Sequence, residues 1–423
     1  MLTLQILKTE TALVKEKLAL KNFKQIQLVD EILVLDEQRR KTQTHNDEIL
    51  AKVNAASKEI GALMRTDVVA ADLKKHEVAQ YKTLTQQLNE QLNELDTQLH
   101  NLLVQLPNLP HSTVPIGTTA EHNVVVKQHG EMPTLLPTAK PHWELIKTYN
   151  LVDFELGAKI TGSGFPLYIG KGAKLQRALV QYFLDCNIAA GYTEVIPPYL
   201  VNEASAFGTG SLPDKEGQMY YMPEDNLYLI PTSELPVTNI YRDEIIAATK
   251  LPIMLTAHSC CFRREAGSFG SDVRGLNRVH QFEKVEIVQL TTANKSYQTL
   301  EAMVSHVESI LQSLQLPYRI LRLCGGDMSF TSALTYDFEV FSAAQQKWLE
   351  VSSVSNFESF QTNRMKIRTK NEQGKSQLLH SLNGSSLALP RIMAALLENF
   401  QTDGCINLPK VLHTYFGEAS ITL

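Results

Sequence analysis

The chain has 423 residues, 43% of them hydrophobic, which is enough for two or three domains with buried cores. Its formal net charge of -5 argues against a general polyanion binder, because non-specific nucleic-acid affinity comes from an excess of Lys and Arg. The first residues alternate apolar with charged side chains, and no segment approaches the roughly 18 apolar residues of a membrane span. These features argue against a signal peptide and a membrane protein, and predict a soluble cytosolic one.

The five cysteines are scattered along the chain. No CxxC pair occurs, and an odd number of cysteines cannot all be joined within one chain. Thiols without a chemical role are the favoured interpretation, and a structural zinc is the weaker alternative. We therefore expect no structural zinc.

Two heptad stripes predict a pair of long helices in the first quarter of the chain. Core positions in each stripe recur in alternating steps of three and four, which is the spacing of a coiled coil. The first stripe is Ile32, Leu35, Arg39, Thr42, Asn46, Ile49, Val53, Ala56, Ile60 and Leu63, and the second is Leu88, Leu92, Leu95, Leu99, Leu102 and Leu106. Gly61 and the region of Thr66 and Asp67 can turn the chain between them, so we predict an antiparallel two-helix coiled-coil arm.

The pattern changes after this arm, where the prolines of LPNLPHSTVPIG (106–117) end any helix. Apolar runs then predict strands at 192–196, 227–230 and 285–288, and helices at 173–185, 296–314 and 389–400. Because no regular βαβ alternation is visible, we expect an α+β fold on a largely antiparallel β-sheet. The predicted organisation is an N-terminal helical arm over 1–110, a linker over 111–140 and a mixed domain over 141–423.

The segment 261–290 is the most informative part of the sequence. Its arginines, acids and aromatic residues, which flank a Gly-containing loop, are Arg263, Arg264, Arg274, Arg278, Glu265, Glu283, Glu286, Phe262, Phe269 and Phe282. An arginine fork suits a phosphate and an aromatic ring offers a stacking face for a base, which suggests nucleotide binding. From composition alone, a solvated strand pair with ordinary cross-strand ion pairs is an equal alternative.

Alternation on a β-hairpin sharpens this suggestion. Residues two apart point to the same face, so Arg263 would lie with Glu265, and Phe282 with Lys284 and Glu286. Such rows can line one pocket.

Further polar segments lie at 231–234, 350–353 and 382–391. Glu350 with Ser353 could hold Mg²⁺, which prefers oxygen ligands and keeps much of its water and phosphate shell. Taken singly, each segment is a weak signal, and a polar loop or strand end is the favoured alternative.

As a whole, the sequence resembles the seryl-tRNA synthetases. GYTEVIPPYLV (191–201) is similar to their motif 1, FRREAG through HQFEKVEIV to motif 2, and NGSSLALPRIMAALLENFQ (383–401) to motif 3. Those motifs are shared by class II synthetases, whereas PTSELPVTN (231–239), EVSSVSNFESFQ (350–361) and the helical hairpin point to the seryl branch. The resemblance covers essentially the full chain. It implies a class II catalytic domain over 141–423, an antiparallel sheet flanked by helices, and a homodimer joined through motif 1.

The resemblance also implies residue roles. Arg263 would grip the α-phosphate and the serine carboxylate, Phe282 would stack on adenine, and Arg391 would pack on its other side near the γ-phosphate, so both arginines are candidate catalytic residues. The implied ATP-binding set is Arg263, Arg264, Glu265, Arg278, Val279, Phe282, Glu350, Val351, Ser352, Ser353 and Arg391, with Mg²⁺ held through ATP by Glu350 and Ser353. The implied serine-binding set is Thr232, Ser233, Glu234, Glu286, Asn383 and Ser385.

The implied activity is ATP-dependent activation of L-serine to seryl-adenylate and transfer of serine to the 3′ end of tRNA(Ser). No general base is needed in the first step, because the serine carboxylate is already ionised at neutral pH. The arm would reach the long variable arm of the tRNA, and whether tRNA(Sec) is also charged stays open. Candidate phosphate contacts on the arm are Lys52, Lys58, Arg65, Lys74, Lys75 and Lys82.

Three positions depart from the family pattern, among them Ser386 and Pro390, which stand where glycine is common. Arg264 stands where a small residue is usual, and alternation turns it away from the face of Arg263. Pro390 suits a first helical turn, so a helix is predicted to begin near it. The alternatives are a class II enzyme for another amino acid, a synthetase-like protein that binds RNA or a carrier protein without charging tRNA, and a coiled-coil scaffold. The scaffold explains only the first quarter of the chain.

Overall fold

The computed structural model describes residues 1–265 and 274–423. It forms two compact units, one of residues 1–19 and 23–107 and the other of residues 20–22 and 108–423. Among the helices in the described part of the chain, none is long and apolar enough to cross a membrane.

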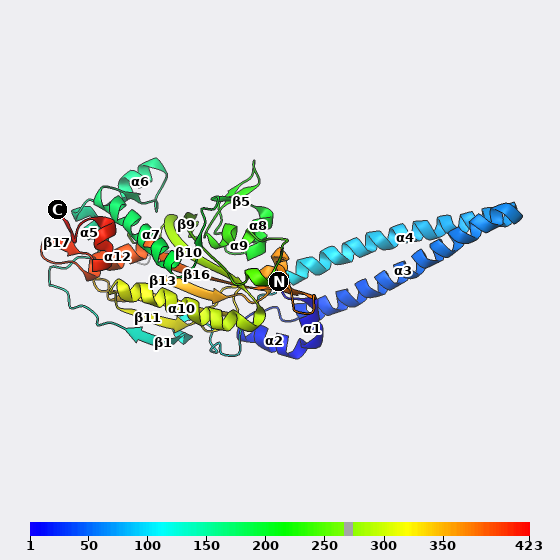
Figure 1. Cartoon of the computed structure of the whole chain (residues 1–423), viewed down its shortest axis with the longest axis horizontal. Helices are drawn as coiled ribbons and strands as arrows, with labels where there is room; N and C mark the ends of the chain where they lie inside the picture. Colours follow the sequence, from blue (N-terminus) through cyan, green and yellow to red (C-terminus); the bar gives the residue numbers. More distant parts are fainter. Residues whose placement is uncertain (266–273) are drawn as a thin grey trace. The chain divides into compact units, whose positions relative to one another are not determined.

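A hairpin of two long helices dominates the first unit (Figure 1). α3 (Leu28–Thr66) and α4 (Val68–Leu103) lie side by side, after the shorter α1 (Leu4–Thr9) and α2 (Thr11–Leu20). Asp67 separates the two long helices, and its carboxylate accepts a hydrogen bond from the Ala70 amide at 3.0 Å, which caps α4. The predicted hairpin and its turn near Thr66 are confirmed.

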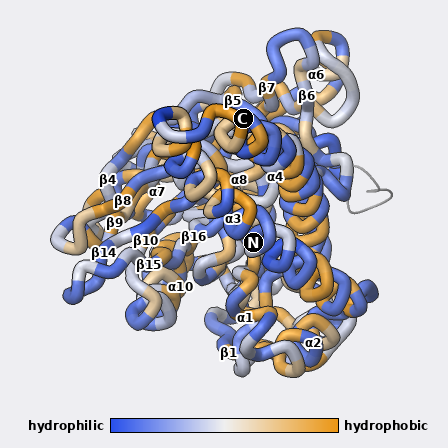
Figure 2. The backbone as a smooth tube through the Cα atoms, turned by 90° about the vertical axis from the view of Figure 1, so that its right-hand side faces the viewer, coloured by the Kyte–Doolittle hydropathy of each residue, from blue (hydrophilic) through white to orange (hydrophobic). Residues whose placement is uncertain are grey.

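The seam of this hairpin is more polar on α3 than on α4. Hydrophobic and hydrophilic residues alternate along the helices (Figure 2), and the buried predicted leucines of α4 are Leu88, Leu92, Leu95 and Leu99. Across the seam, Nδ2 of Asn46 donates to Oδ1 of Asn89 at 2.9 Å. Arg39, a predicted core position, is half-buried: its guanidinium contacts the buried Asp36 at 3.1 Å and lies 3.8 Å from Asp96 of α4. Asp36 can be buried because Lys8 also neutralises it, at 2.5 Å.

The second unit is built on an 8-stranded sheet in the order β1-β11-β12-β13-β16-β10-β9-β4. Only the β4–β9 pair of this sheet is parallel among the described residues, so the predicted largely antiparallel sheet is confirmed. In sheet order the strands are Val124–His129, Tyr318–Arg322, Leu334–Ser342, Lys347–Asn356, His380–Ala388, Gln281–Thr291, Ile253–Phe262 and Thr193–Glu194.

Smaller elements surround this sheet. The helices are α5 (His142–Thr148), α6 (Phe154–Ile160), α7 (Lys171–Ala189), α8 (Glu203–Thr209), α9 (Glu234–Asn239), α10 (Ser296–Ser313), α11 (Phe360–Met365), α12 (Leu389–Asn399) and α13 (His413–Phe416), with short 3-10 turns η1 (Ala120–His122), η2 (Ala248–Lys250), η4 (Ala293–Lys295) and η5 (Lys410–Leu412). The short strands pair as β2 (Val152–Asp153) with β3 (Leu167–Tyr168), β5 (Leu200–Asn202) with β7 (Leu227–Leu229) and β6 (Tyr221–Met222), β8 (Ile245–Ile246) with β14 (Arg368–Lys370) and β15 (Ser376–Leu378), and β17 (Cys405–Asn407) with β18 (Ser420–Thr422).

Three helices, α7, α10 and α12, pack against the sheet and correspond to the three predicted helices. Their apolar residues share one core with Val285 and Ile287 of β10. Because successive residues of a strand point to opposite faces, Phe282, Lys284 and Glu286 of β10 face away from this core. The helical core therefore leaves the opposite face of the sheet for a binding site.

Part of the predicted linker belongs to the sheet. Residues 124–129 form β1 at the sheet edge, beside β11, and every residue of this strand is exposed. Three consecutive valines, Val124 to Val126, favour a strand. The run is short and has no buried face, so it lacks the alternating pattern that would have indicated a strand from sequence.

Candidate active site

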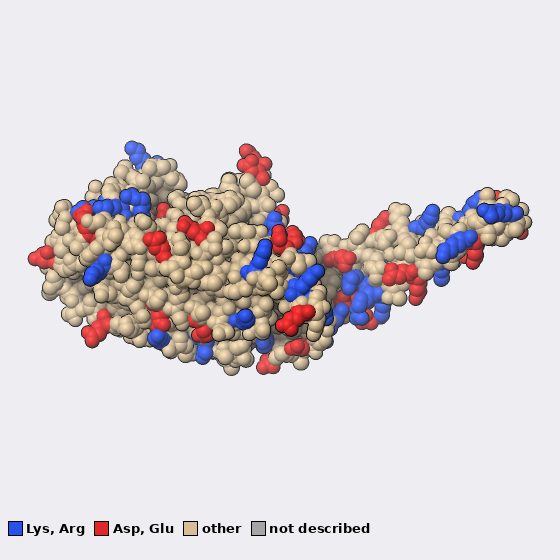
Figure 3. Space-filling view, in the orientation of Figure 1, with Lys and Arg blue, Asp and Glu red and all other residues tan. Residues whose placement is uncertain are grey.

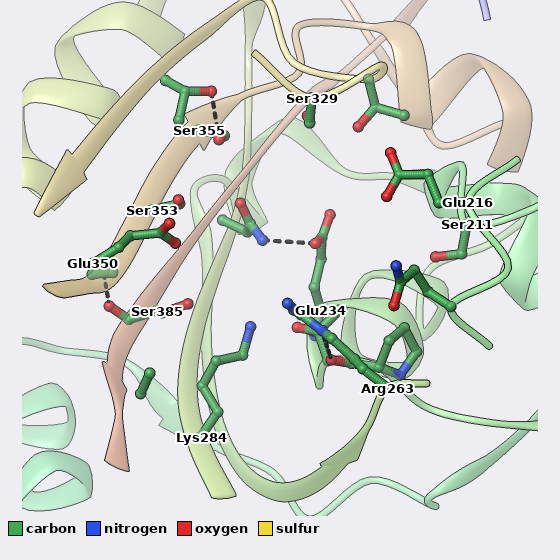
Figure 4. A pocket seen from close by; sticks show the side chains of 18 of the residues that line it. Ser211, Glu216, Glu234, Arg263, Lys284, Ser329, Glu350, Ser353, Ser355 and Ser385 are labelled. Carbon is green, nitrogen blue, oxygen red and sulfur yellow. Dashed lines mark hydrogen bonds between the residues drawn. The ribbon is translucent and has the colours of Figure 1, made fainter. Parts of the chain in front are cut away.

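A cavity of about 720 Å³ opens on the sheet face that carries Phe282 and Lys284. Figure 4 shows Glu234, Arg263 and Lys284 directed into it from different elements. The predicted site residues that line it are Thr232, Glu234, Arg263, Glu265, Arg278, Val279, Phe282, Glu350, Val351, Ser352, Ser353, Asn383, Ser385 and Arg391. The structure thus brings together residues that are up to about 160 positions apart in the sequence.

Arg263 follows β9 directly and is fixed through its main chain. Its amide donates to the carbonyl of His280 at 3.0 Å, and its own carbonyl lies 3.0 Å from Nδ1 of the same histidine. The guanidinium carbon lies 5.2 Å from the centre of the Phe282 ring, and Nε donates to the Pro231 carbonyl at 3.3 Å. A cation and an aromatic face are therefore held at one wall of the cavity.

Two carboxylates, those of Glu234 and Glu286, are bridged by one amide. Nδ2 of Asn383 donates to Oε2 of Glu234 at 2.7 Å and to Oε1 of Glu286 at 3.0 Å. Glu286 is only 1% exposed, beneath the cavity surface, where it forms an ion pair with Lys284 at 2.6 Å. The hydroxyl of Ser385 also donates to Glu286, at 3.4 Å. The cluster has two acids and one lysine, so it can carry a net negative charge.

The proximity of the two carboxylates changes the protonation of Glu234. Burial, and next the neighbouring Glu286 carboxylate, raise the pKa of Glu234 to about 7. A hydrogen bond from Gln361 Nε2 to Oε1 of Glu234, 2.7 Å long, opposes this shift by favouring the ionised form. An added cation would therefore be stabilised here, because it would relieve the repulsion between the two acids.

The residues before Glu234 differ in their exposure to the cavity. Thr232 lines it, and its hydroxyl accepts a hydrogen bond from the Glu234 amide at 3.2 Å, at the start of α9. Ser233 is fully buried, and its Oγ lies 2.6 Å from Oγ of Ser259. The side chain of Ser233 therefore packs beneath the site and does not line the cavity.

A second arginine lies at the first turn of α12, which begins at Leu389 with Pro390 in its first turn as predicted. Nε of Arg391 donates to the carbonyl of Asn277 at 3.0 Å, and a terminal nitrogen donates to the carbonyl of Glu350 at 2.6 Å. These two acceptors are main-chain groups, and the nearest carboxylate, that of Glu350, lies 4.0 Å away in a long ion pair, so the guanidinium can still contact an anionic ligand.

Glu265 and Arg278 form an ion pair across the hairpin, at 2.6 Å between carboxylate and guanidinium. Glu265 has a φ of 49°, in the left-handed region, which ends the alternation that began on β9. Glu265 therefore does not continue the strand row of Arg263 as predicted, although both residues line the cavity as predicted. Phe269, in the predicted loop, lies outside the described residues.

Oxygen atoms that could contact a metal ion lie on β12 and β13. Oγ of Ser353 donates to Oδ1 of Asp337 at 2.5 Å, and Glu350 lies on the same wall (Figure 4). Burial, and next the charge of Glu350, raise the pKa of Asp337 well above its ordinary value. In residues 1–265 and 274–423, no group of three or more His, Cys, Asp or Glu is arranged to hold a metal. The few oxygens fit Mg²⁺, which binds through one or two carboxylates and substrate phosphates.

Arg264 is the predicted ATP-binding residue that the structure turns away from the cavity. Its Nε donates to the carbonyl of Met219 at 2.9 Å, and its guanidinium lies 4.6 Å from the centre of the Tyr220 ring. This orientation agrees with the strand alternation, which places neighbours on opposite faces. Arg264 should therefore be removed from the set of side chains that could touch ATP.

Among the residues that sequence reasoning missed are Lys284 and Asp337, which line the cavity, and Gln361, which donates to Glu234. Lys284 shared a predicted row with Glu286, and this spacing of two was the available signal for their pairing. Gln361 was included only in a family segment, and Asp337 stood in a strand without any motif. The partners of Gln361 and Asp337 are known only once the sheet is assembled.

The comparisons with known proteins agree along the whole chain. Residues 220–400 match the tRNA synthetase class II core domain (G, H, P, S and T), and residues 1–110 match the seryl-tRNA synthetase N-terminal domain. The chain is 50% identical over 426 residues to the serine–tRNA ligase of Salinibacter ruber, covering 100% of this chain and 99% of that protein.

Two solved structures are also similar. The seryl-tRNA synthetase of Pyrococcus horikoshii complexed with ATP has a TM-score of 0.93 at 31% identity, covering 100% of this chain and 99% of that one. The cytoplasmic serine–tRNA ligase of Naegleria fowleri in complex with AMP has a TM-score of 0.87 at 25% identity, with the same coverage. The chain therefore belongs to the seryl-tRNA synthetase family, the serine–tRNA ligases among the class II aminoacyl-tRNA synthetases.

Proposed function

We propose that the cavity is the place where this serine–tRNA ligase joins L-serine to ATP and then transfers serine to the 3′ end of tRNA(Ser). The observation that carries the assignment is Glu234, which lines the same cavity as two arginines and is bridged by Asn383 to Glu286 beneath the cavity surface. A cation-accepting pocket beside groups that suit phosphates is what an amino acid and ATP require together.

The serine end of the cavity is proposed to be the cluster of Glu234, Glu286, Asn383, Ser385 and Thr232. The ammonium group of serine would neutralise the two carboxylates, and its hydroxyl would meet the polar groups of the pocket. A site that hydrogen-bonds a substrate hydroxyl discriminates strongly against analogues that lack it, because its own polar groups are then left unpaired. Threonine would have to be excluded by size.

ATP is proposed to bind between Phe282 and Arg391, with adenine stacked on the ring of Phe282. In the structure the guanidinium of Arg263 lies over the same ring, so Arg263 would shift toward the α-phosphate and the serine carboxylate when substrates bind. Glu265, held by Arg278, would face the adenine side. The P. horikoshii relative complexed with ATP supports nucleotide binding by this fold.

The first reaction step is in-line attack of the serine carboxylate oxygen on the α-phosphorus, with pyrophosphate leaving. Arg263 and Arg391 would orient the two reactants and stabilise the charge that develops on the phosphoryl oxygens. Glu350 and Ser353 would hold Mg²⁺, which when bound supplies further charge neutralisation of the phosphates. In the second step a ribose hydroxyl of the tRNA attacks the seryl-adenylate and releases AMP.

The helical arm is proposed to bind tRNA, as the region 1–110 ahead of a linker (111–140) and the catalytic domain (141–423). Figure 3 shows Lys and Arg side chains among acidic ones along α3 and α4. Lys52, Lys58 and Arg65 are exposed, whereas Lys74 is engaged by Glu59 at 3.2 Å. The exposed residues are therefore the better candidates for phosphate contacts.

We also infer a homodimer in the cytosol. Ile196, in motif 1, is 86% exposed, and Ile188 and Leu200, which are near it in the sequence, are 45% and 40% exposed. Apolar side chains of this size are usually covered when they gather on one surface, and a second copy of motif 1 is the proposed cover. Sedimentation of the purified chain would test this, and a monomer at micromolar concentration would refute it.

ATP–pyrophosphate exchange against each amino acid tests the proposed function. Exchange should depend on serine, and the enzyme should then form seryl-tRNA with purified tRNA(Ser). Strong exchange with proline or threonine and none with serine would overturn the assignment of the pocket. A parallel charging reaction with tRNA(Sec) would decide whether that tRNA is a second substrate.

A further inference from the structure

A buried histidine outside the cavity holds the segment 276–279, which lines it. His142 begins α5 and is fully buried. Its Nε2 lies 2.9 Å from the amide nitrogen of Leu276, and its Nδ1 lies 2.7 Å from Oε1 of Glu398. A main-chain amide can only donate, so Nε2 is the acceptor and Nδ1 carries the hydrogen. The two contacts thus select one neutral tautomer of His142.

The carboxylate of Glu398 is held by several donors. Oε1 accepts from the amide of His142 at 2.9 Å and from Nε2 of Gln345 at 3.0 Å, and Oε2 accepts from the hydroxyl of Ser342. Burial opposes ionisation, but the hydrogen bonds from His142 and Ser342 outweigh it and lower the pKa of Glu398. Glu398 therefore stays an acceptor and orients the imidazole toward Leu276.

Helix α12 contacts this segment at two points. Arg391 and Glu398 are about two turns apart on the helix and lie on nearly the same side. Arg391 donates to the carbonyl of Asn277 at 3.0 Å. Glu398 accepts from Nδ1 of His142, and Nε2 of His142 accepts from the amide of Leu276. Nδ2 of Asn277 donates to Oε1 of Gln345 at 2.9 Å, and Nε2 of Gln345 donates to Oε1 of Glu398 at 3.0 Å. The hydrogen bonds form a closed ring, so the loss of one member loosens the others.

The backbone at Gly275, just before the segment 276–279, packs closely against the imidazole of His142. Gly275 has a φ of 64°, and a Cβ added there would lie 2.4 Å from Nε2 of His142. Neither the conformation nor the space suits a larger residue. The close approach of Gly275 to the imidazole brings the amide of Leu276 within hydrogen-bonding distance of Nε2 of His142.

We propose that His142 is a positioning residue for adenylate formation. By accepting a hydrogen bond from Leu276, it keeps the carbonyl of Asn277 where that carbonyl orients Arg391. His142 itself lies outside the cavity and touches no substrate. This inference rests on the proposed role of Arg391 at the ATP phosphates.

The test is ATP–pyrophosphate exchange by the full chain with His142→Phe and His142→Gln. Phe keeps a ring and removes both hydrogen bonds, whereas Gln offers a donor and an acceptor. We expect His142→Phe to raise the KM for ATP about tenfold and leave the KM for serine within about twofold, with His142→Gln in between. Tyr318→Phe is the matched control, because it removes a buried hydroxyl that donates to Glu308 at 2.5 Å and should leave both KM values unchanged.

A double-mutant cycle identifies the route of the effect. If His142 acts through Arg391, His142→Phe should change the KM for ATP less than about threefold in an Arg391→Ala background. Equal changes in the two KM values, or none, in a folded His142→Phe variant would overturn the proposal while serine-dependent exchange by the parent enzyme stands. Should His142→Phe not fold, a folded His142→Gln variant in which the KM for ATP rises, by less than about tenfold, and the KM for serine stays within about twofold would sustain the proposal. Equal changes in both KM values, or no change in either, would overturn it. If the parent enzyme shows no serine-dependent ATP–pyrophosphate exchange, the proposed function itself is refuted.

Discussion

The carboxylates and the arginines of the cavity are held in opposite ways. Glu234 and Glu286 are surrounded by side-chain donors, namely Asn383, Gln361 and Lys284. Arg263 and Arg391 instead donate to main-chain carbonyls, at 3.3 Å from Pro231 and 3.0 Å from Asn277. The carboxylates therefore depend on the charge of their neighbours, and the arginines depend on the course of the backbone.

This difference predicts which substitutions affect only one side chain and which affect the whole cluster. A change of charge among the carboxylates alters the protonation of the whole cluster, because the two acids are coupled through Asn383 and through space. A change at an arginine removes a cation without altering its carbonyl partners, which are neutral. Effects at Arg263 should thus appear mainly in the chemical step, effects at Arg391 in the chemical step and in the KM for ATP, and effects at the carboxylates in serine binding and its pH dependence.

Arg263→Ala should have the largest effect. Removing the cation proposed to contact the α-phosphate withdraws charge stabilisation that is realised in the transition state, so the rate of adenylate formation should fall by about 10³-fold or more. Single-turnover measurement of adenylate formation at saturating ATP and serine checks it. Near-normal turnover in a folded variant would refute the phosphate role of Arg263.

Glu286→Gln should raise the serine requirement. The amide keeps the shape of the side chain and a hydrogen bond with Asn383, but the negative charge that would attract the serine ammonium is lost. We expect the KM for serine to increase about 10- to 100-fold and the KM for ATP to change little. The free energy of unfolding must be measured in parallel, since Lys284 loses its buried partner. A parallel rise in both KM values would count against a serine-specific role.

The pH dependence of serine binding should reflect Glu234. Its pKa of about 7 means that the carboxyl group is protonated below neutral pH, where it loses its attraction for an ammonium group. The KM for serine should therefore rise as pH falls from about 8 to 6, by up to about tenfold per pH unit below the pKa. Glu234→Gln should have a higher KM at neutral pH and a flatter profile. A profile equally steep in this variant would assign the titration to another group.

The fold was easier to predict from sequence than the site. The leucines of α4 repeat every three or four residues, and the strand signals of β10 are local, so each can be recognised within a short window. Asn383 lies on β16 and Glu234 on α9, and nothing near either residue in the sequence indicates their hydrogen bond. Such pairings arise from the order of strands in the sheet, which local periodicity does not specify.

The family resemblance supplied most of the candidate residues, and the structure shows which of their side chains line the cavity. For Arg264 the local alternation and the structure agree against its inclusion in the ATP set, because alternation depends only on the neighbouring residues of one strand. Asp337 had no such signal. Its hydrogen bond to Ser353 depends on the register of β12 with β13, which is displaced by an irregularity between Phe338 and Glu339.

Arg264→Ala should have the smallest effect and serves as the control for Arg263→Ala. The guanidinium packs over Tyr220 and donates to Met219, on the side of the strand opposite to Arg263. Its removal should cost about 1 kcal/mol of folding stability and change the rate of adenylate formation less than about threefold. Thermal unfolding and the same single-turnover assay measure both quantities. A rate loss comparable to that of Arg263→Ala would mean that the rate depends on the charge of Arg264 as well, and would contradict the distinction between the two orientations.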